Sequence, residues 1–266
     1  MRQISGHDRI IDRLVKGHDE IIYNLFYVIR SGENAFIVTD DRSYILAQSN
    51  PNTPIWIYCN NKMDHTSECE LVRLLCERIE LNNNVHIVAQ AERIANVFEQ
   101  VADIMGIQFE EYMPMSVYAC HQVNIINEEG ERVMPNAQYV KQIAELAIQQ
   151  TWGAEHIELA YVDAFGFAEG NKDSKNLFLW KNENIVAMAR VAHKNEKYAR
   201  INTVVTERSQ RGKGYARMLV GSISKDLLNE GIIPMLYADT NNPSSNSAYL
   251  KIGFEKVGEI DEFQIK

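Results

Sequence analysis

Apolar residues change their spacing along the first half of the chain, which indicates alternating helices and strands. Over residues 8–30 they recur every three to four positions, as expected for one face of a helix, and Gly17 interrupts them. We therefore expect one or two amphipathic helices there. The pattern predicts the following further elements in the first half: strands at 35–38, 44–47, 55–59, 85–89, 107–111 and 116–121, and helices at 67–80 and 91–105.

The second half has longer apolar strands and clearer helices. Residues 153–175 show no clear period, and Gly166, Gly170 and Asn171 predict a loop near their end. The pattern predicts helices at 137–150, 215–229 and 244–251, strands at 176–180, 185–192, 199–206 and 234–238, and a β-hairpin at 254–265. Both halves mix helices with strands, so the sequence predicts an α/β (α+β) fold.

The polar segment 124–136 divides the chain. It contains Gly130 and Pro135 and is typical of a linker, although a long surface loop is the alternative. We therefore expect two domains, 1–125 and 126–266. Each half ends with a helix, a glycine (Gly106 or Gly253) and a strand pattern. Either the lobe is duplicated, or glycine simply ends both helices because it is a common helix stop.

Charge and composition exclude several classes of protein. The net charge of −9 argues against nucleic acid as a partner. No apolar run reaches the ~20 residues that span a membrane, and the first residues lack a signal-peptide core, so we expect a cytoplasmic protein. No Cys or His spacing indicates a metal site. Residues 1–125 hold 10 Lys and Arg against 17 Asp and Glu, which either steers a cationic substrate or serves solubility.

The stretch 204–216, VVTERSQRGKGYA, joins a β-branched strand to a helix through a glycine loop. Gly212 and Gly214 let the backbone approach a phosphate, and the amides at the helix start point toward it. Basic side chains surround the loop, and a tight turn with a solvated basic rim is the alternative. The spacing is not that of a Walker loop, and Arg217 stands where a dinucleotide fingerprint needs Gly or Ala.

A second polar constellation begins at Asn242, which with Pro243 forms a good helix start. Asn242, Ser245, Asn246 and Tyr249 then recur at helical spacing, which places them on one stripe of a short helix. This stripe either contacts a ligand or has structural roles, with Asn242 as a plain cap and Tyr249 as a half-buried tyrosine.

Together, the two stretches resemble the GNAT superfamily of N-acetyltransferases, in its bacterial type with an additional N-terminal lobe. The resemblance covers about residues 126–266 and rests on two motifs, [Q/R]-x-x-G-x-[G/A] and N-x-x-[S/A]-x-x-x-Y. The matching residues are Arg211, Gly214 and Ala216 in the first motif, and Asn242, Ser245 and Tyr249 in the second, followed by Lys251, Gly253 and Phe254. It implies a mixed, mostly antiparallel C-terminal sheet flanked by helices. The N-terminal α/β lobe is then either a degenerate GNAT-like repeat or an acceptor-specificity domain.

The resemblance also implies a reaction: acetyl-CoA donates its acetyl group to the primary amine of a small molecule or peptide by direct attack, without a metal. Tyr249 would protonate the departing thiolate. The cofactor would be bound by the backbone of Val204, Val205 and Thr206 at its pantetheine arm, by Arg211, Gly212, Lys213, Gly214, Tyr215, Ala216 and Arg217 around its pyrophosphate, and by Asn242 and Ser245.

The chain departs from one branch of this family at the position of the general base. Histone-type members place Glu eleven residues before the first motif, where this chain has Arg200. A base is needed because a lysine-like amine has a pKa of about 10.4. Glu207, Asp239, His193 or a water chain are the candidates. The alternative function is a non-catalytic acyl-CoA-binding or sensing protein with an N-terminal interaction lobe, whereas a nucleotide phosphotransferase lacks its acidic metal-binding motif.

Overall fold

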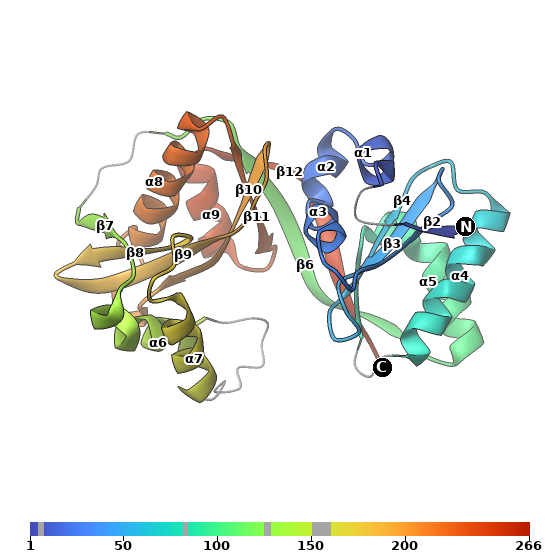
Figure 1. The fold of residues 1–266 in the computed structure, drawn as a ribbon, viewed down its shortest axis with the longest axis horizontal. Helices are drawn as coiled ribbons and strands as arrows, with labels where there is room; N and C mark the ends of the chain where they lie inside the picture. The colour runs from blue at the N-terminus through green and yellow to red at the C-terminus, as the bar shows by residue number, and fades with distance from the viewer. Residues whose placement is uncertain (5–7, 82–84, 125–128, 151–160) are drawn as a thin grey trace. The chain divides into compact units, whose positions relative to one another are not determined.

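The computed structural model describes residues 1–4, 8–81, 85–124, 129–150 and 161–266. They divide into two compact units, Met1–Val117 with Val257–Lys266, and Tyr118–Lys256 (Figure 1). The chain enters the second unit within one strand and returns to the first within its last strand. The expected boundary at residue 125 therefore lies a few residues after the crossing, and it does not foresee the return of the C-terminal segment.

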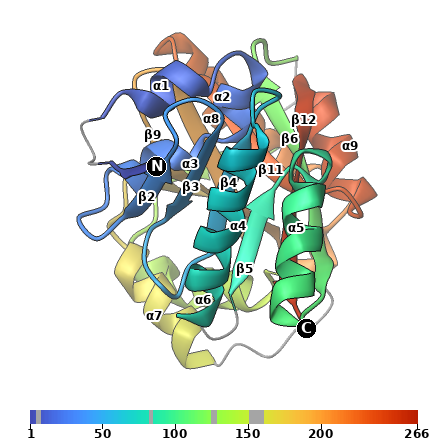
Figure 2. The same cartoon turned by 90° about the vertical axis from the view of Figure 1, so that its right-hand side faces the viewer.

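The first unit packs helices against a mixed sheet. Its strands lie in the order β1-β2-β3-β4-β5-β12, antiparallel except for the parallel pair β4 and β5. Figure 2 shows α4 and α5 side by side over these strands, with which they share one apolar core. Its elements before the crossing are β1 (Arg2–Gln3), α1 (Ile10–Leu14), α2 (His18–Ile22), α3 (Leu25–Arg30), β2 (Phe36–Thr39), β3 (Tyr44–Gln48), β4 (Ile55–Cys59), α4 (His65–Glu80), β5 (His86–Ala89), α5 (Ala91–Met105) and β6 (Phe109–Cys120), whose end lies in the second unit.

The second unit has helices on both faces of its sheet. Its strands lie in the order β7-β8-β9-β10-β11, followed by the end of β6. Helices α8 and α9 cover one face, and α6 and α7 cover the other (Figure 1). Its elements are β7 (Glu131–Val133), η1 (Ala137–Tyr139), α6 (Val140–Ile148), α7 (Tyr161–Asn171), β8 (Leu177–Asn182), β9 (Asn184–Lys194), β10 (Tyr198–Thr206), η2 (Arg208–Gln210), α8 (Tyr215–Asn229), β11 (Ile233–Asp239), α9 (Pro243–Ile252) and the start of β12 (Phe254–Ile265).

Strands β10 and β11 separate part-way along β10. In the described pairings they run parallel only from Tyr198 to Arg200, whereas β10 stays paired with β9 up to Thr206. The register of β10 with β9 shifts between Asn202 and Val205, and Thr203 within this shift has φ of 53°. A β-branched residue rarely adopts this conformation. The middle of β10 is thus a strained bulge beside an opened sheet.

The two halves of the chain repeat one order of elements: a strand, helices, three antiparallel strands, a helix, a strand parallel to the third, a helix and a last strand. Gly106 and Gly253 end α5 and α9 in left-handed conformations with φ of 68° and 115°. The repeated order favours duplication of the lobe over a coincidence of helix stops. The last strand of each half runs into the other unit.

Several sequence expectations were wrong in detail. The region 8–30 forms three short helices, α1 to α3. The two strands expected over 107–121 are one strand, β6, and the hairpin expected at 254–265 is one strand, β12. Gly258 marks a close approach and not a turn, because a Cβ there would collide with Cδ1 of Ile22.

Gly166, Gly170 and Asn171 predicted a loop, yet they lie in α7, which covers Tyr161–Asn171. It packs Ala164 and Ala168 into the core that α6 shares with the sheet, and this burial outweighs the low helix propensity of glycine. Residues 125–128 of the expected linker, and residues 153–160 of the stretch without a clear period, lie outside the described residues.

No helix in the described parts of the chain is long and apolar enough to cross a membrane.

Candidate functional site

The loop between β10 and α8 is a backbone cradle. Gly212 and Gly214 have left-handed conformations with φ of 81° and 88°, which suit glycine far better than other residues. Gly214 is the N-cap of α8 and supplies no side-chain acceptor. The amides of Tyr215, Ala216 and Arg217 belong to the first helical turn, which has no intrahelical acceptor for them. These amides and the helix dipole together favour a bound anion.

The basic side chains of this loop differ in their hydrogen bonds. The Nε atom of Arg211 donates to the Thr206 carbonyl at 3.2 Å, which ties the loop to the end of β10. Lys213 is exposed and donates to a neighbouring loop side chain at 2.8 Å. The Nε atom of Arg217 is buried and has no hydrogen-bond partner among the described residues. Arg217 is therefore the cation at the start of α8 best placed to meet an anion.

Val204, Val205 and Thr206 lie on the part of β10 that is no longer paired with β11 in the described pairings. Val205 and Thr206 pair with Met188 and Ala187 of β9, which occupies one backbone edge. The described pairings leave the edge toward β11 open beyond Arg200. An open strand edge can hold an extended ligand that carries amide groups, as in β-augmentation.

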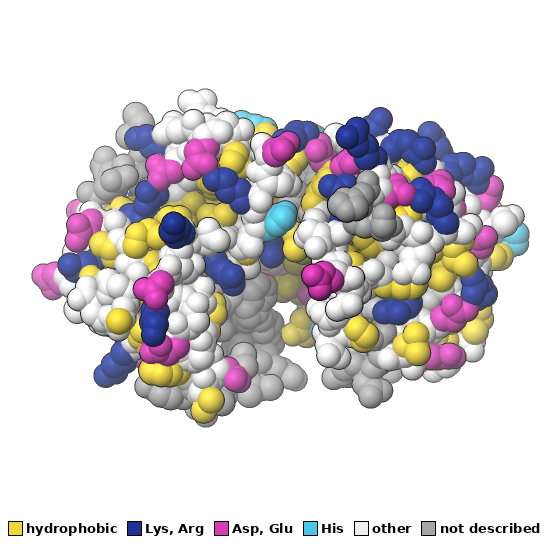
Figure 3. Space-filling view, in the orientation of Figure 1, with side chains coloured by type: hydrophobic (Ala, Val, Ile, Leu, Met, Phe, Trp, Pro, Cys, Tyr) yellow, Lys and Arg dark blue, Asp and Glu magenta, His cyan; other side chains and the backbone are white. Residues whose placement is uncertain are grey.

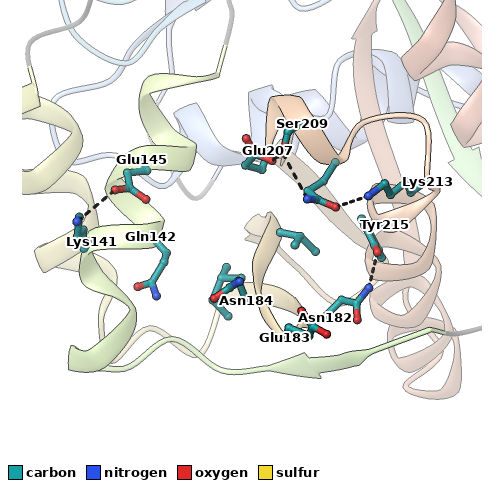
Figure 4. Close-up of a pocket in the computed structure, with 13 residues that line it drawn as sticks. Lys141, Gln142, Glu145, Asn182, Glu183, Asn184, Glu207, Ser209, Lys213 and Tyr215 are labelled. Carbon is teal, nitrogen blue, oxygen red and sulfur yellow. Dashed lines mark hydrogen bonds and ion pairs between the residues drawn. The ribbon is translucent and has the colours of Figure 1, made fainter.

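A pocket of about 670 Å³ adjoins the loop. Figure 4 shows α6, the turn between β8 and β9, and the loop before α8 around it. Lys213 and Tyr215 are the predicted site residues that line it, and Glu145, Glu183 and Glu207 line it as well. Three carboxylates in its lining make this pocket unsuited to a phosphate.

The second motif forms the start of α9. Oδ1 of Asn242 accepts a hydrogen bond from the Ser245 amide at 3.1 Å, which confirms the predicted cap. Asn246 lies one turn further along: its Nδ2 donates to the Asp239 carbonyl at 2.9 Å, and its Oδ1 accepts from the Tyr118 hydroxyl at 3.0 Å. The motif thus fastens α9 to β11 and β6. A contact of Asn242 or Ser245 with a cofactor stays a prediction.

Tyr249 lies buried between the aromatic rings of Tyr118 and Phe254, with ring centroids 6.1 and 6.0 Å away. The described residues supply no hydrogen-bond partner for its hydroxyl. Burial, and to a lesser extent Tyr118, raises the pKa of Tyr249 to about 12. The phenol is therefore protonated at neutral pH, which is the state that a proton donor requires.

The candidate bases lie in different surroundings. Burial and then the Arg200 charge lower the pKa of His193, whose Nε2 atom is buried without a partner. A hydrogen bond from the Ser209 side chain is the main cause that lowers the pKa of Glu207, which is half-buried. Asp239 accepts a hydrogen bond from a loop amide at 2.8 Å. His193 is the neutral, partly buried group among them.

The structure brings together residues that the sequence did not connect. Arg200 and Asn202 of β10 face His193 and Arg190 of β9 in register. Ile201, between them, points into the core under α8. Of these polar residues, the sequence reasoning considered only Arg200 and His193. The alternation of polar and apolar residues on β10 was the available signal.

The corresponding loop of the first unit is built differently. The helix after β4, α4, is capped by Asp64, whose Oδ1 accepts from the Ser67 amide at 3.0 Å. That backbone hydrogen bond, followed by one from Arg42, lowers the pKa of Asp64 to about 2. A carboxylate thus occupies the place that Gly214 leaves open in the second unit, and it would repel a phosphate.

The described residues contain no group of three or more His, Cys, Asp or Glu side chains positioned to hold a metal ion.

Comparisons with known proteins point to one fold. Residues 179–262 match a family model described as FR47-like protein. A GCN5-related N-acetyltransferase from Sphaerobacter thermophilus superposes with a TM-score of 0.64 at 13% identity, covering 100% of this chain and 94% of that chain. An acetyltransferase from the GNAT family from Colwellia psychrerythraea superposes with a TM-score of 0.60 at 14% identity, covering 100% of this chain and 99% of that chain. The chain has the GNAT fold.

The GNAT fold extends over both units. A tandem GNAT protein from the clavulanic acid biosynthesis pathway superposes with a TM-score of 0.55 at 12% identity, covering 99% of this chain and 97% of that chain. No curated protein sequence matches the chain. The predicted GNAT-type sheet with flanking helices is therefore confirmed, and the additional N-terminal lobe belongs to the architecture shared with these structures.

Proposed function

We propose that this GNAT-fold protein is an acyl-CoA-dependent N-acetyltransferase. In this proposal the first turn of α8 holds the pyrophosphate of the donor, and the open edge of β10 binds its pantetheine arm. The observation that carries the proposal is the cradle: Gly212 and Gly214 in left-handed conformations, three amides without intrahelical acceptors, and Arg217 with an unpartnered Nε. A pyrophosphate joined to an extended amide-bearing arm fits both features. The GNAT fold supports acyl transfer as general chemistry.

The remaining predicted residues have supporting roles in this proposal. Arg211 and Lys213 form the rim of the cradle, and Asn242 and Ser245 meet the donor at the start of α9. The backbone of Val204, Val205 and Thr206 pairs with the amides of the pantetheine arm. The acceptor is an amine-bearing small molecule or peptide, in the cytoplasm, and acetyl is the transferred group.

The reaction is a direct displacement. The amine nitrogen attacks the thioester carbonyl, a C–N bond forms and the C–S bond breaks. The amine gives one proton to a base, which is His193 or water, and the departing sulfur receives one proton from Tyr249. A backbone amide of the bulge near Thr203 stabilises the oxyanion that develops during attack.

Release of free thiol from acetyl-CoA tests this proposal. Amines of different charge and size are supplied as acceptors, and calorimetry with acetyl-CoA and CoA measures binding separately. We expect both binding and amine-dependent thiol release. Binding without release by any amine would support the acyl-CoA-sensing alternative, and absence of binding would exclude both functions.

A further inference from the structure

One face of the second unit's sheet carries a cluster of polar side chains. In register, Arg200 of β10 lies opposite His193 of β9, and Asn202 lies opposite Arg190. On its other side Arg200 lies beside Met235 of β11. Directly paired residues project from the same face of a sheet. Ile201, which projects from the other face, lies in the core under α8, so the two arginines face away from α8.

The two arginines are partly buried, and no described residue pairs with them as an opposite charge. The Nε atoms of Arg190 and Arg200 and the Nε2 atom of His193 are buried and have no hydrogen-bond partner among the described residues. No Asp or Glu of the described residues forms an ion pair with either guanidinium. Burial is the main cause that lowers the pKa of Arg200, and Arg190 lowers it further, whereas Tyr237 raises it.

Another arginine of the same chain shows how a buried guanidinium is normally accommodated. The half-buried Arg93 of α5 donates to both carboxylate oxygens of Asp19, at 2.9 and 3.1 Å. Arg190 and Arg200 repel each other, and the described residues supply no such carboxylate to either of them. A buried charge that the fold leaves uncompensated destabilises the free protein, so this arrangement indicates that a ligand supplies the missing anion.

We propose that Arg190 and Arg200 bind an anionic group, a carboxylate or a phosphate, on the acceptor substrate. The planar guanidinium fork matches both groups through paired hydrogen bonds. This inference rests on the proposed function, because it assigns the substrate class of the same transferase site. The acceptor is then an amine that also carries an acid.

The anion bound here is not the donor's pyrophosphate. Arg200 precedes Thr206 by six residues on β10, which is about 20 Å of extended strand. The cradle at the start of α8 lies beyond Thr206, on the opposite side of the bulge at Thr203. The anionic group of the acceptor and the pyrophosphate of the donor therefore have separate sites.

The positive charge of the arginines also serves the chemistry of the amine. It disfavours an ammonium group nearby and so favours the neutral amine that attacks the thioester. His193, directly opposite Arg200, is kept neutral by burial and by the same charge. The acidic composition of residues 1–125 is compatible with the amine of such an acceptor. The two arginines select for the anionic group that the same acceptor carries.

Matched acceptors test the proposal. β-Alanine is compared with β-alaninamide, and 2-aminoethyl phosphate with 2-aminoethanol, so that each pair differs in the anionic group. We expect kcat/KM to be at least 30-fold higher for one or both acids than for its neutral partner. The pair with the larger ratio identifies carboxylate or phosphate as the group.

The variant Arg200→Met separates binding from folding. If the arginine serves a ligand, its removal leaves the melting temperature unchanged or higher, because an uncompensated charge is lost. We expect the acid preference in kcat/KM to fall at least tenfold and the Kd for CoA to stay within twofold. Arg200→Lys should recover part of the preference. Arg73→Met, at an exposed position on α4, is the control that should change none of these values.

A readout without turnover keeps the two proposals distinguishable. We expect β-alanine or 2-aminoethyl phosphate, and not its neutral partner, to raise the melting temperature of the wild-type protein but not of Arg200→Met. No CoA binding would refute the transferase, and with it the assignment to the acceptor. CoA binding with equal use of acidic and neutral amines, or a lowered melting temperature of Arg200→Met with unchanged acid preference, would overturn the arginine proposal alone.

Discussion

The Tyr249 side chain combines a buried ring with a hydroxyl that keeps its proton. Its ring is buried between two aromatic rings, yet its hydroxyl has no partner among the described residues. Burial holds its pKa near 12, so the hydroxyl stays protonated throughout the range in which a transferase would work.

Replacing Tyr249 with Phe should therefore affect turnover and not donor binding. The ring contacts remain, but the proton donor is lost, so we expect kcat to fall by about 100-fold, within the range for general acids. The Kd for acetyl-CoA should stay within twofold by calorimetry. In the wild-type protein, deprotonation of Tyr249 should cause no loss of rate up to about pH 10. An unchanged kcat in the variant would remove Tyr249 from the acid role.

Asn242 caps α9 in the structure and has a proposed role toward the donor, and two substitutions separate the two roles. Asn242→Ala loses the cap and should lower the free energy of unfolding by about 1 kcal/mol. Asn242→Asp caps as well as Asn but lacks the amide donor and adds negative charge. We expect Asp to restore the melting temperature while the Kd for CoA stays weakened by about fivefold. Recovery of both would leave Asn242 as a cap alone.

Local chemistry made some residues predictable and left others hidden. The cap at Asn242 follows from an Asn-Pro pair at a helix start, so the sequence predicted it. The isolation of Arg190 and Arg200 depends on which strands lie side by side and on whether any carboxylate reaches them. Strand pairing and long-range contacts belong to the tertiary structure, so no local stretch of the sequence could have predicted them.

The start of α8 is the element on which the proposed donor site depends. Its sequence signal, a strand followed by two glycines and a helix, was sufficient to predict the element's type and position. The strands β6 and β12 are each longer than the sequence predicted: the pattern indicated two strands over 107–121 and a hairpin over 254–265. Helix α7 was missed because its glycines weaken the helical pattern in the sequence, whereas burial in the folded protein stabilises the helix.

Two alanine substitutions of left-handed glycines test the cradle. Gly214 and Gly231 flank α8 with φ of 88° and 77°, and an added Cβ meets nothing closer than 3.7 Å at Gly214 and nothing within 4 Å at Gly231. Each substitution should cost about 1 kcal/mol of unfolding free energy through backbone strain. Only Gly214→Ala should weaken CoA binding, by about tenfold in a calorimetric titration. Equal CoA affinities in the two variants would contradict the assignment of the cradle.

The two halves of the molecule repeat the same order of elements. They differ in the loop that follows β4 in the first half and β10 in the second. The second copy has a glycine cradle, whereas the first has Asp64 as a cap. The sequence pattern did not indicate that residues 257–266 return to the first unit. That return depends on pairing between β12 and β5, residues distant in the chain.

A substitution near the C-terminus should therefore destabilise the first unit. Phe263 is buried in the core with α4 and α5, and its ring packs edge-on against Phe98 at 4.9 Å. Phe263→Ala should cost about 3 kcal/mol and lower hydrogen-exchange protection of β5 and α5. The exposed Glu255→Ala on the same strand is the control. Loss of protection confined to β8 and β9 would contradict this assignment of β12.

A calorimetric titration of CoA into the full chain is the most direct test of the proposed donor site. The account predicts one CoA per chain, because the described residues provide one glycine cradle and the corresponding loop of the first unit carries a carboxylate. Affinity should fall about tenfold in Gly214→Ala and stay unchanged in Asp64→Ala. Absence of binding, two equivalents per chain, or binding that Gly214→Ala leaves intact would contradict the account.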